Sequence, residues 1–347
     1  MISNWKHELI ELAQDSSSSG LHKLLFKLSE LLATPNKVRR HDVVVAINAL
    51  YCTGKIRYND LPLSVALHLA HGDIDEAHEV LVECLHLPDN ELVNIIHKNG
   101  RHHSRAISNR QDINVAVTDA LLLTKDLETV VTVAKNLGAK LSPLGVAIAV
   151  NMAFESEELV SPLIYRNETG TKHAATLYYL TSSKDDKEGA IKKWGLTHTH
   201  MNSGLMAAVE RMTSRLEFCD DDTVDQVAKN MVARGMVTVD TIMYAADKGI
   251  RPLLFRLLEA MSGVPHQEIR SFIDKDQCDR FAAVARYIDL SPPQFASVFL
   301  RANGSRVRPP GLIGKALTIY SHLSHERAAR IIKHIISAQD YAKKAAE

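Results

Sequence analysis

Histidine pairs are the first features of this sequence that could do chemistry, because imidazole binds metal ions and transfers protons near neutral pH. The chain holds 17 histidines, and two pairs stand close together, His102 with His103 and His198 with His200. Neighbours on a helix point about 100° apart, and a metal ion needs several ligands within coordination distance. Spacing identifies no further ligand, so the sequence predicts structural or solvated histidines and no metal site.

An acidic run, Asp220 to Asp222 with Asp225, offers the oxygen ligands that divalent cations prefer, but its spacing does not match a calcium loop. It stands beside an apolar stripe that starts at Val224, where carboxylates cap free N–H groups and complement the helix dipole. We interpret it as a helix start. Gly170–Lys172 lacks the upstream glycine of a phosphate loop, and no catalytic motif is present, so no enzyme activity and no cofactor are predicted.

Two basic clusters are the remaining candidates for a binding site. Basic side chains at the helix ends of a repeat protein line surfaces that bind phosphates or acidic peptides. On this interpretation the partner or anion contacts are Arg101, His102, His103, Arg105, Arg110, Arg166, Arg306 and Arg308. The alternative is a solvated or structural face. On this interpretation Arg110 and Arg166 occupy equivalent places of a weak internal sequence repeat, called the echo below, and hold successive helix ends together. Interleaved aromatic side chains, on which single-stranded nucleic acids stack, are missing.

Composition narrows the classes of function. In 347 residues, 41 Lys and Arg balance 41 Asp and Glu, so nothing draws the whole chain toward nucleic acid or an anionic membrane. Four scattered cysteines form no metal or redox motif and are expected to be reduced, as in a cytoplasmic protein. The first residues lack the apolar core of a signal peptide, and the longest apolar segment, Leu144–Phe154, is too short to insert in a membrane.

Helical spacing of apolar residues runs along the whole chain, and no strand is expected. A clear example is the stripe formed by Ala77, Val80, Leu81, Cys84 and Leu85. Such short helices cannot cover their own apolar stripes, so they must stack on their neighbours. Gly138 is expected to follow the C-cap of one of them.

An internal echo supports the stacking. Leu87-Pro88 corresponds to Leu141–Pro143 about 54 positions later, and Asn109–Asp112 corresponds to Tyr165–Glu168 about 56 positions later. Each repeating unit is expected to hold about three short helices.

A polar stretch suggests two domains. Ser182–Lys187 is charged with weak patterning, and Thr197–His200 shows no helical pattern. We therefore predict an N-terminal HEAT-like helical repeat domain over 1–182, a polar linker over 183–202 and an all-helical C-terminal domain over 203–347.

The order of several short motifs resembles a known family. The run VLVECLHLPDNELVNIIHKNGRHHSRAISNRQDINVAVTDALL is similar to the bacterial family catalogued as domain of unknown function 2336, and a later run, VAKNMVARGMVTVDTIMYAADKGIRPLLFRLLEAMSGVP, looks like its C-terminal half. The positions that match the family's pattern in the first run are His103, Ala106, Ile107, Arg110 and Asp112.

The resemblance covers about residues 20 to 300 and departs from the family at His22, where arginine is more usual, and at Met236–Val239. It implies HEAT-type helical repeats and transfers no active site.

Together these observations predict an all-α protein, a HEAT-like or armadillo-like α-solenoid (a right-handed superhelix of short antiparallel helices) with a C-terminal helical domain. The expected function is a non-catalytic interaction module, an adaptor or scaffold in the cytoplasm whose partner is another protein. The alternative is a helical repeat protein that binds nucleic acid through its local basic clusters. Self-association into a homo-oligomer is a further possibility.

Overall fold

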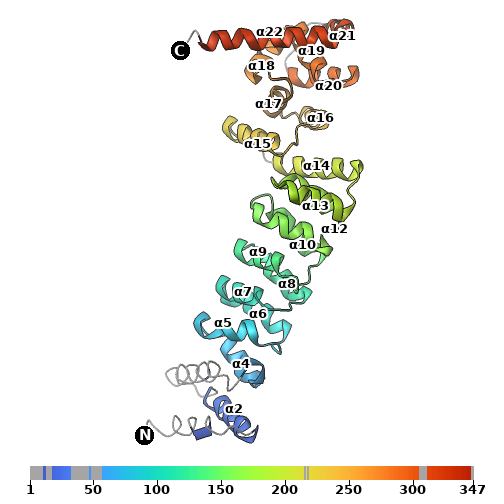
Figure 1. The fold of residues 1–347 in the computed structure, drawn as a ribbon. Coiled ribbons are helices and arrows are strands. Elements are labelled where there is room, and N and C mark those ends of the chain that lie inside the picture. Colours follow the sequence, from blue (N-terminus) through green and yellow to red (C-terminus); the bar gives the residue numbers. More distant parts are fainter. Residues whose placement is uncertain are drawn as a thin grey trace. The chain divides into compact units, whose positions relative to one another are not determined.

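The computed structural model describes residues 11–12, 18–32, 47, 57–214, 216, 219–304 and 311–344. These residues contain twenty α-helices and three short 3-10 helices, and no β-strand; a single bridge joins the loops at Ile113 and Ala139 (Figure 1). The predicted all-α fold is confirmed. Within the described residues no helix combines the length and the apolar character needed to cross a bilayer.

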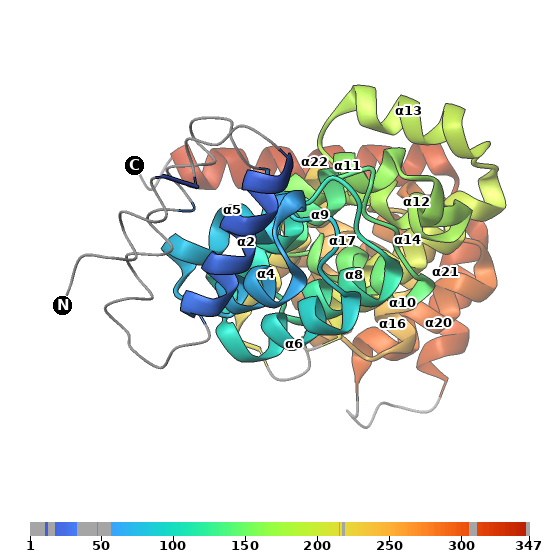
Figure 2. The same ribbon diagram turned by 90° about the horizontal axis from the view of Figure 1, so that it is seen from below.

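The chain forms two compact units, 1–173 and 174–347. The helices of the first unit are α2 (Ser18–Leu32), α4 (Leu63–Ala70), α5 (Ile74–Glu83), α6 (Asp89–Asn99), α7 (Arg101–Ser108), α8 (Val115–Leu123), α9 (Leu127–Lys135), α10 (Pro143–Met152) and α11 (Val160–Tyr165), with 3-10 helices η1 (Tyr58–Asp60), η2 (Glu157–Leu159) and η3 (Asn167–Thr169). Helix α2 packs against α4 (Figure 2).

The second unit holds most of α12 (Gly170–Leu180), whose first residues belong to the first unit. Its other helices are α13 (Lys184–Trp194), α14 (His198–Thr213), α15 (Asp221–Ala233), α16 (Val239–Asp247), α17 (Arg251–Ser262), α18 (His266–Asp274), α19 (Cys278–Tyr287), α20 (Pro292–Asn303), α21 (Leu312–His322) and α22 (His325–Lys344).

The repeating element of the first unit is a pair of helices. The pairs α4/α5, α6/α7, α8/α9 and α10/α11 begin at Leu63, Asp89, Val115 and Pro143, and so start 26, 26 and 28 residues apart. Helices in equivalent positions of successive pairs pack on one another, α5 on α7 on α9 along one side and α6 on α8 on α10 along the other (Figure 1). The echo of about 54 residues therefore spans two pairs, and the expected three-helix unit is wrong.

Local sequence explains where these helices begin and which faces they bury. The side chains of Asn114, Asp126 and Ser142 accept hydrogen bonds from the N–H groups of the first turns of α8, α9 and α10. Four residues of the predicted α5 stripe, Ala77 to Cys84, are fully buried. Leu85 is 58% exposed, because α5 ends at Glu83 and the helical spacing no longer decides which way the next residues point.

Gly138 holds two neighbouring loops together at close range. Ile113 N–H donates to the Gly138 carbonyl at 3.2 Å, and Lys140 N–H donates to the Ile113 carbonyl at 3.0 Å. A Cβ atom on Gly138 would lie 1.8 Å from the carbonyl oxygen of Gln111. Asn136 is the C-cap of α9, so Gly138 is required by this contact between pairs and not by the helix end.

The segment 183–202, interpreted from the sequence as a polar linker, contains helix α13 and the first turn of α14. Thr197 begins α14 through a capping box with His200, whose Nδ1 lies 3.1 Å from the Thr197 hydroxyl. The expectation of no helical structure at Thr197–His200 is therefore wrong, because the capping side chains set the helix start without any apolar spacing. The boundary between the compact units lies at 173/174, ahead of this segment.

Close packing of α14 on α12 gives the first testable prediction. A Cβ atom on Gly204 of α14 would lie 2.4–2.7 Å from the backbone and Cβ of Ala175 in α12. We expect Gly204→Ala to lower the free energy of unfolding by about 1–3 kcal/mol, because the helices must separate. Gly314→Ala in α21 is the matched control: a Cβ atom there would meet no heavy atom within 4 Å, so it should be neutral or gain up to about 1 kcal/mol. Urea unfolding of both variants measures the difference, and equal effects would contradict the close approach.

Candidate functional site

The predicted contact residue Arg110 is a structural residue at the end of a helix. Its side chain is 3% exposed, and its guanidinium donates to the carbonyls of Leu81 and Cys84 at the C-terminus of α5, the latter at 2.7 Å. Burial lowers the pKa of the Arg110 guanidinium from its ordinary value. Burial also raises the pKa of the neighbouring Cys84 thiol, which makes this cysteine a poor nucleophile.

Arg166 makes the equivalent contact two pairs later, as the sequence echo predicts. It is 2% exposed and donates to four backbone carbonyls of α9 and the loop after it, including Val133 at 3.1 Å and Asn136 at 2.7 Å. It also binds Glu168 Oε1 at 2.9 Å. Burial would raise the pKa of Glu168, but the hydrogen bond and charge of Arg166 leave it below its ordinary value.

Asn136 makes the contact in between, and the sequence reasoning missed it. It stands 26 residues after Arg110, and its side-chain amide donates to the carbonyls of Arg110 at 2.7 Å and Ser108 at 3.3 Å, at the C-terminus of α7. We call Arg110, Asn136, Arg166 and the carbonyls they bind the carbonyl ladder. A search with the 26-residue spacing of the pairs would have found Asn136.

Unit 2 contains similar contacts. Arg286 donates to the carbonyls of Tyr320 and Leu323 at the end of α21, at 3.1 and 2.9 Å, and its guanidinium lies 4.3 Å from the centre of the Tyr320 ring. Arg251 donates to the carbonyl of Ala302 near the end of α20 at 3.0 Å. These arginines satisfy helix ends within unit 2.

Helix α7 joins two neighbouring inter-helix turns. The buried His103 ring places Nε2 3.0 Å from the Gly72 carbonyl in the α4–α5 turn. Arg105 forms a two-pronged ion pair with Asp126 in the α8–α9 turn, at 2.9 and 2.8 Å, and also pairs with Glu128. Hence His103 and Arg105, predicted as contacts for a partner, have structural partners, whereas Arg101 and His102 are exposed.

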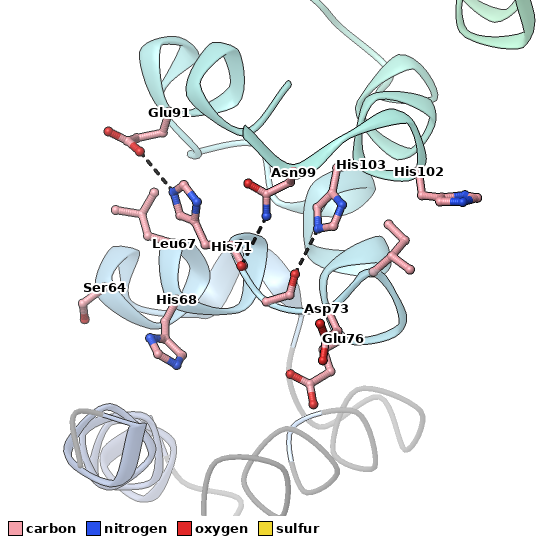
Figure 3. Close-up of a pocket in the computed structure, with 12 residues that line it drawn as sticks. Ser64, Leu67, His68, His71, Asp73, Glu76, Glu91, Asn99, His102 and His103 are labelled. Atoms are coloured by element: carbon pink, nitrogen blue, oxygen red, sulfur yellow. Dashed lines mark hydrogen bonds and ion pairs between the residues drawn. The ribbon is translucent and has the colours of Figure 1, made fainter. Parts of the chain in front are cut away.

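An open cleft of about 1030 Å³ is the strongest candidate site in unit 1. It lies where α4, the turn after it and the start of α5 face α6 and α7, and it includes the exposed His102 (Figure 3). His71 Nε2 lies 3.2 Å from a carboxylate oxygen of Glu91, and Asn99 donates to the His71 carbonyl at 3.3 Å (Figure 3). The wall is thus built from side chains that also fix the turn.

The acidic side chains of this cleft are not balanced by arginine or lysine. Its lining includes the carboxylates of Asp73, Glu76 and Glu91 and four histidines, and no arginine or lysine. Such a surface favours a cationic or hydrogen-bonding group over a phosphate. Across the described part of the chain, no three His, Cys, Asp or Glu side chains converge well enough to hold a metal ion.

The remaining sequence candidates lie apart from the cleft. His200 belongs to the capping box of α14. Asp220 caps α15 by accepting from Thr223 N–H at 2.9 Å, and Asp225 pairs with Arg256, so the interpretation of the acidic run as a helix start is confirmed. Arg306 and Arg308 lie outside the described residues.

Comparison with known proteins gives a family. The model of a family described as an uncharacterised protein conserved in bacteria (DUF2336) matches residues 77–333. This range includes all six described candidates, Arg101, His102, His103, Arg105, Arg110 and Arg166. No curated protein matches the chain.

The carbonyl ladder predicts a large effect on stability from one buried arginine. We expect Arg166→Met to lower the free energy of unfolding by about 3 kcal/mol, because buried carbonyls lose their donor. Arg166→Lys should recover only part of this loss, since an ammonium group cannot reproduce the fork of the guanidinium. The exposed Arg101→Met is the control and should stay within about 0.5 kcal/mol of the parent in urea unfolding. A small loss at Arg166 would show that the ladder contributes little.

The Arg105–Asp126 pair predicts a pH dependence. The hydrogen bond from Arg105 holds the pKa of Asp126 well below its ordinary value. The ion pair contributes fully to the free energy of unfolding above the unfolded-state pKa of the aspartate, about 4. This contribution is lost as the pH falls below that value. The free energy of unfolding should therefore fall between about pH 5 and pH 2, and Asp126→Asn should make this fall shallower. Denaturant unfolding over that pH range tests it; identical slopes in the two proteins would refute the assignment.

Proposed function

The chain belongs to the bacterial family DUF2336, and from that premise we propose that it is a non-catalytic helical-repeat module that binds another protein in the cytoplasm. The observation that carries the proposal is the regular succession of helix pairs, each packed on the next and joined to it by the carbonyl ladder. A stack of this kind becomes longer with each repeat, and the surface available to a partner grows with the number of repeats. We propose the HEAT-like α-solenoid as the architecture of the first unit for the same reason.

The use of the arginines supports a protein partner over nucleic acid. The structure describes four of the arginines selected from the sequence. Three of them donate hydrogen bonds to carbonyls and carboxylates within the protein: Arg105, Arg110 and Arg166. A guanidinium engaged in this way has few donors left for phosphates. The open cleft of unit 1 is lined by carboxylates and histidines, and carboxylates repel a phosphate backbone. A protein surface, with its mixture of charges and apolar groups, fits better.

An affinity experiment on the full chain tests the proposal. The immobilised protein is exposed to extract from its own bacterium, and bound proteins are quantified. We expect a partner present in stoichiometric amount, with nothing comparable on a column of an unrelated helical protein. Recovery of the chain alone would favour self-association.

A parallel experiment measures retention on generic duplex DNA. A nucleic-acid-binding protein would be retained at about 50 mM salt and lose binding steeply toward about 200 mM. We expect no such retention. Steep, salt-dependent retention by the parent chain would overturn the choice of a protein partner in favour of the nucleic-acid alternative.

A further inference from the structure

Unit 2 has an open groove of about 760 Å³ between α22 and the first turns of α18 and α19. One wall is a single face of α22, formed by Arg327, Arg330, Ile331, His334, Ile335 and Ala338 at helical spacing. The facing turns contribute Glu268, Asp279 and Arg280. The groove therefore has a strip of isoleucine between basic side chains.

Within the described part of the chain, no side-chain hydrogen bond or ion pair accounts for the two arginines of α22, Arg327 and Arg330. Arg327 and Arg330 are exposed, and neither forms an ion pair with a carboxylate of the described residues. Arg327 is the third residue of α22, where the helix dipole favours anions and disfavours a cation. This differs from Arg110, Arg166, Arg251 and Arg286, each of which binds backbone carbonyls.

The two acids of the groove stand at helix starts. Glu268 and Asp279 stand in the first turns of α18 and α19, where the free N–H groups and the dipole stabilise a carboxylate. Arg280 lies over the ring of Phe272, 5.6 Å from its centre, and keeps its charge. Among the lining side chains the arginines Arg280, Arg327 and Arg330 outnumber the two carboxylates, and the α22 wall itself carries no carboxylate.

We propose that this groove binds an acidic segment of a partner protein, one that places two carboxylates against Arg327 and Arg330 and an aliphatic side chain against Ile331 and Ile335. This proposal rests on the proposed function and assigns it a surface and a partner chemistry. Charge complementarity selects the acidic side chains, and the half-buried Ile331, beside the largely buried Ile335, favours an apolar neighbour. A phosphate backbone fits less well, because it carries no apolar group to set against the isoleucines.

Peptide selection on the full chain tests the proposal. A displayed library of random peptides is selected on the parent protein, and the recovered peptides are synthesised and titrated against purified variants. We expect peptides rich in Asp or Glu with at least one Leu or Ile. Arg330→Glu should weaken their binding by at least about tenfold, because it replaces attraction by repulsion.

Lys333→Glu is the matched control. Lys333 lies on the same helix and is exposed but does not line the groove, so the same change of charge there should weaken binding clearly less than Arg330→Glu does, because it makes no direct contact with the peptide. Circular dichroism of both variants confirms that α22 is intact. A charge-matched oligonucleotide, titrated in parallel, distinguishes general anion binding from recognition of a peptide.

The outcomes separate the two proposals. Recovered peptides that bind Arg330→Glu and the parent protein equally well would overturn the groove assignment and leave the protein-binding function standing. Peptides without acidic residues, or an oligonucleotide that competes as well as the selected peptides, would also overturn it. Recovery of no peptide at all, together with no partner from the cell extract, would count against both.

Discussion

Helix ends are the constraint on which the rest of this structure depends. A chain folded into many short helices has many C-termini, and each leaves carbonyl groups that its own helix cannot satisfy. Buried carbonyls without donors are costly, and water does not reach those inside a stack. The carbonyl ladder solves this by taking donors from the next pair: Arg110 for α5, Asn136 for α7 and Arg166 for α9.

The carbonyl ladder makes the end of each helix depend on packing between neighbouring pairs. The donor always follows the second helix of the next pair, so a helix end is satisfied only when that pair is in place. The pairing of α7 with both neighbouring turns through His103 and Arg105 has the same property. Each pair is therefore stabilised by its neighbours, which is the cooperativity expected of repeat proteins.

The same constraint changes how the basic residues are understood. Arginine is suited to these positions because its planar fork reaches several carbonyls at once and stays charged when buried. A basic residue close to a helix end is thus ambiguous in sequence: Arg110 and Arg327 look alike, yet one is buried in the ladder and the other faces an open groove. The open cleft of unit 1 is lined instead by histidines and carboxylates.

The sequence by itself determined the all-α class, the buried face of α5, the start of α15 at its acidic run and the equivalence of Arg110 and Arg166. Each depends on short-range periodicity or on capping chemistry, which neighbouring residues encode. Only the tertiary structure decided that the unit is a pair of helices, that Gly138 serves a contact between loops and that the cleft beside His102 is acidic. These depend on which segments meet across 25 to 35 residues of chain, and spacing along one helix carries no information about the side chains that another helix places opposite it.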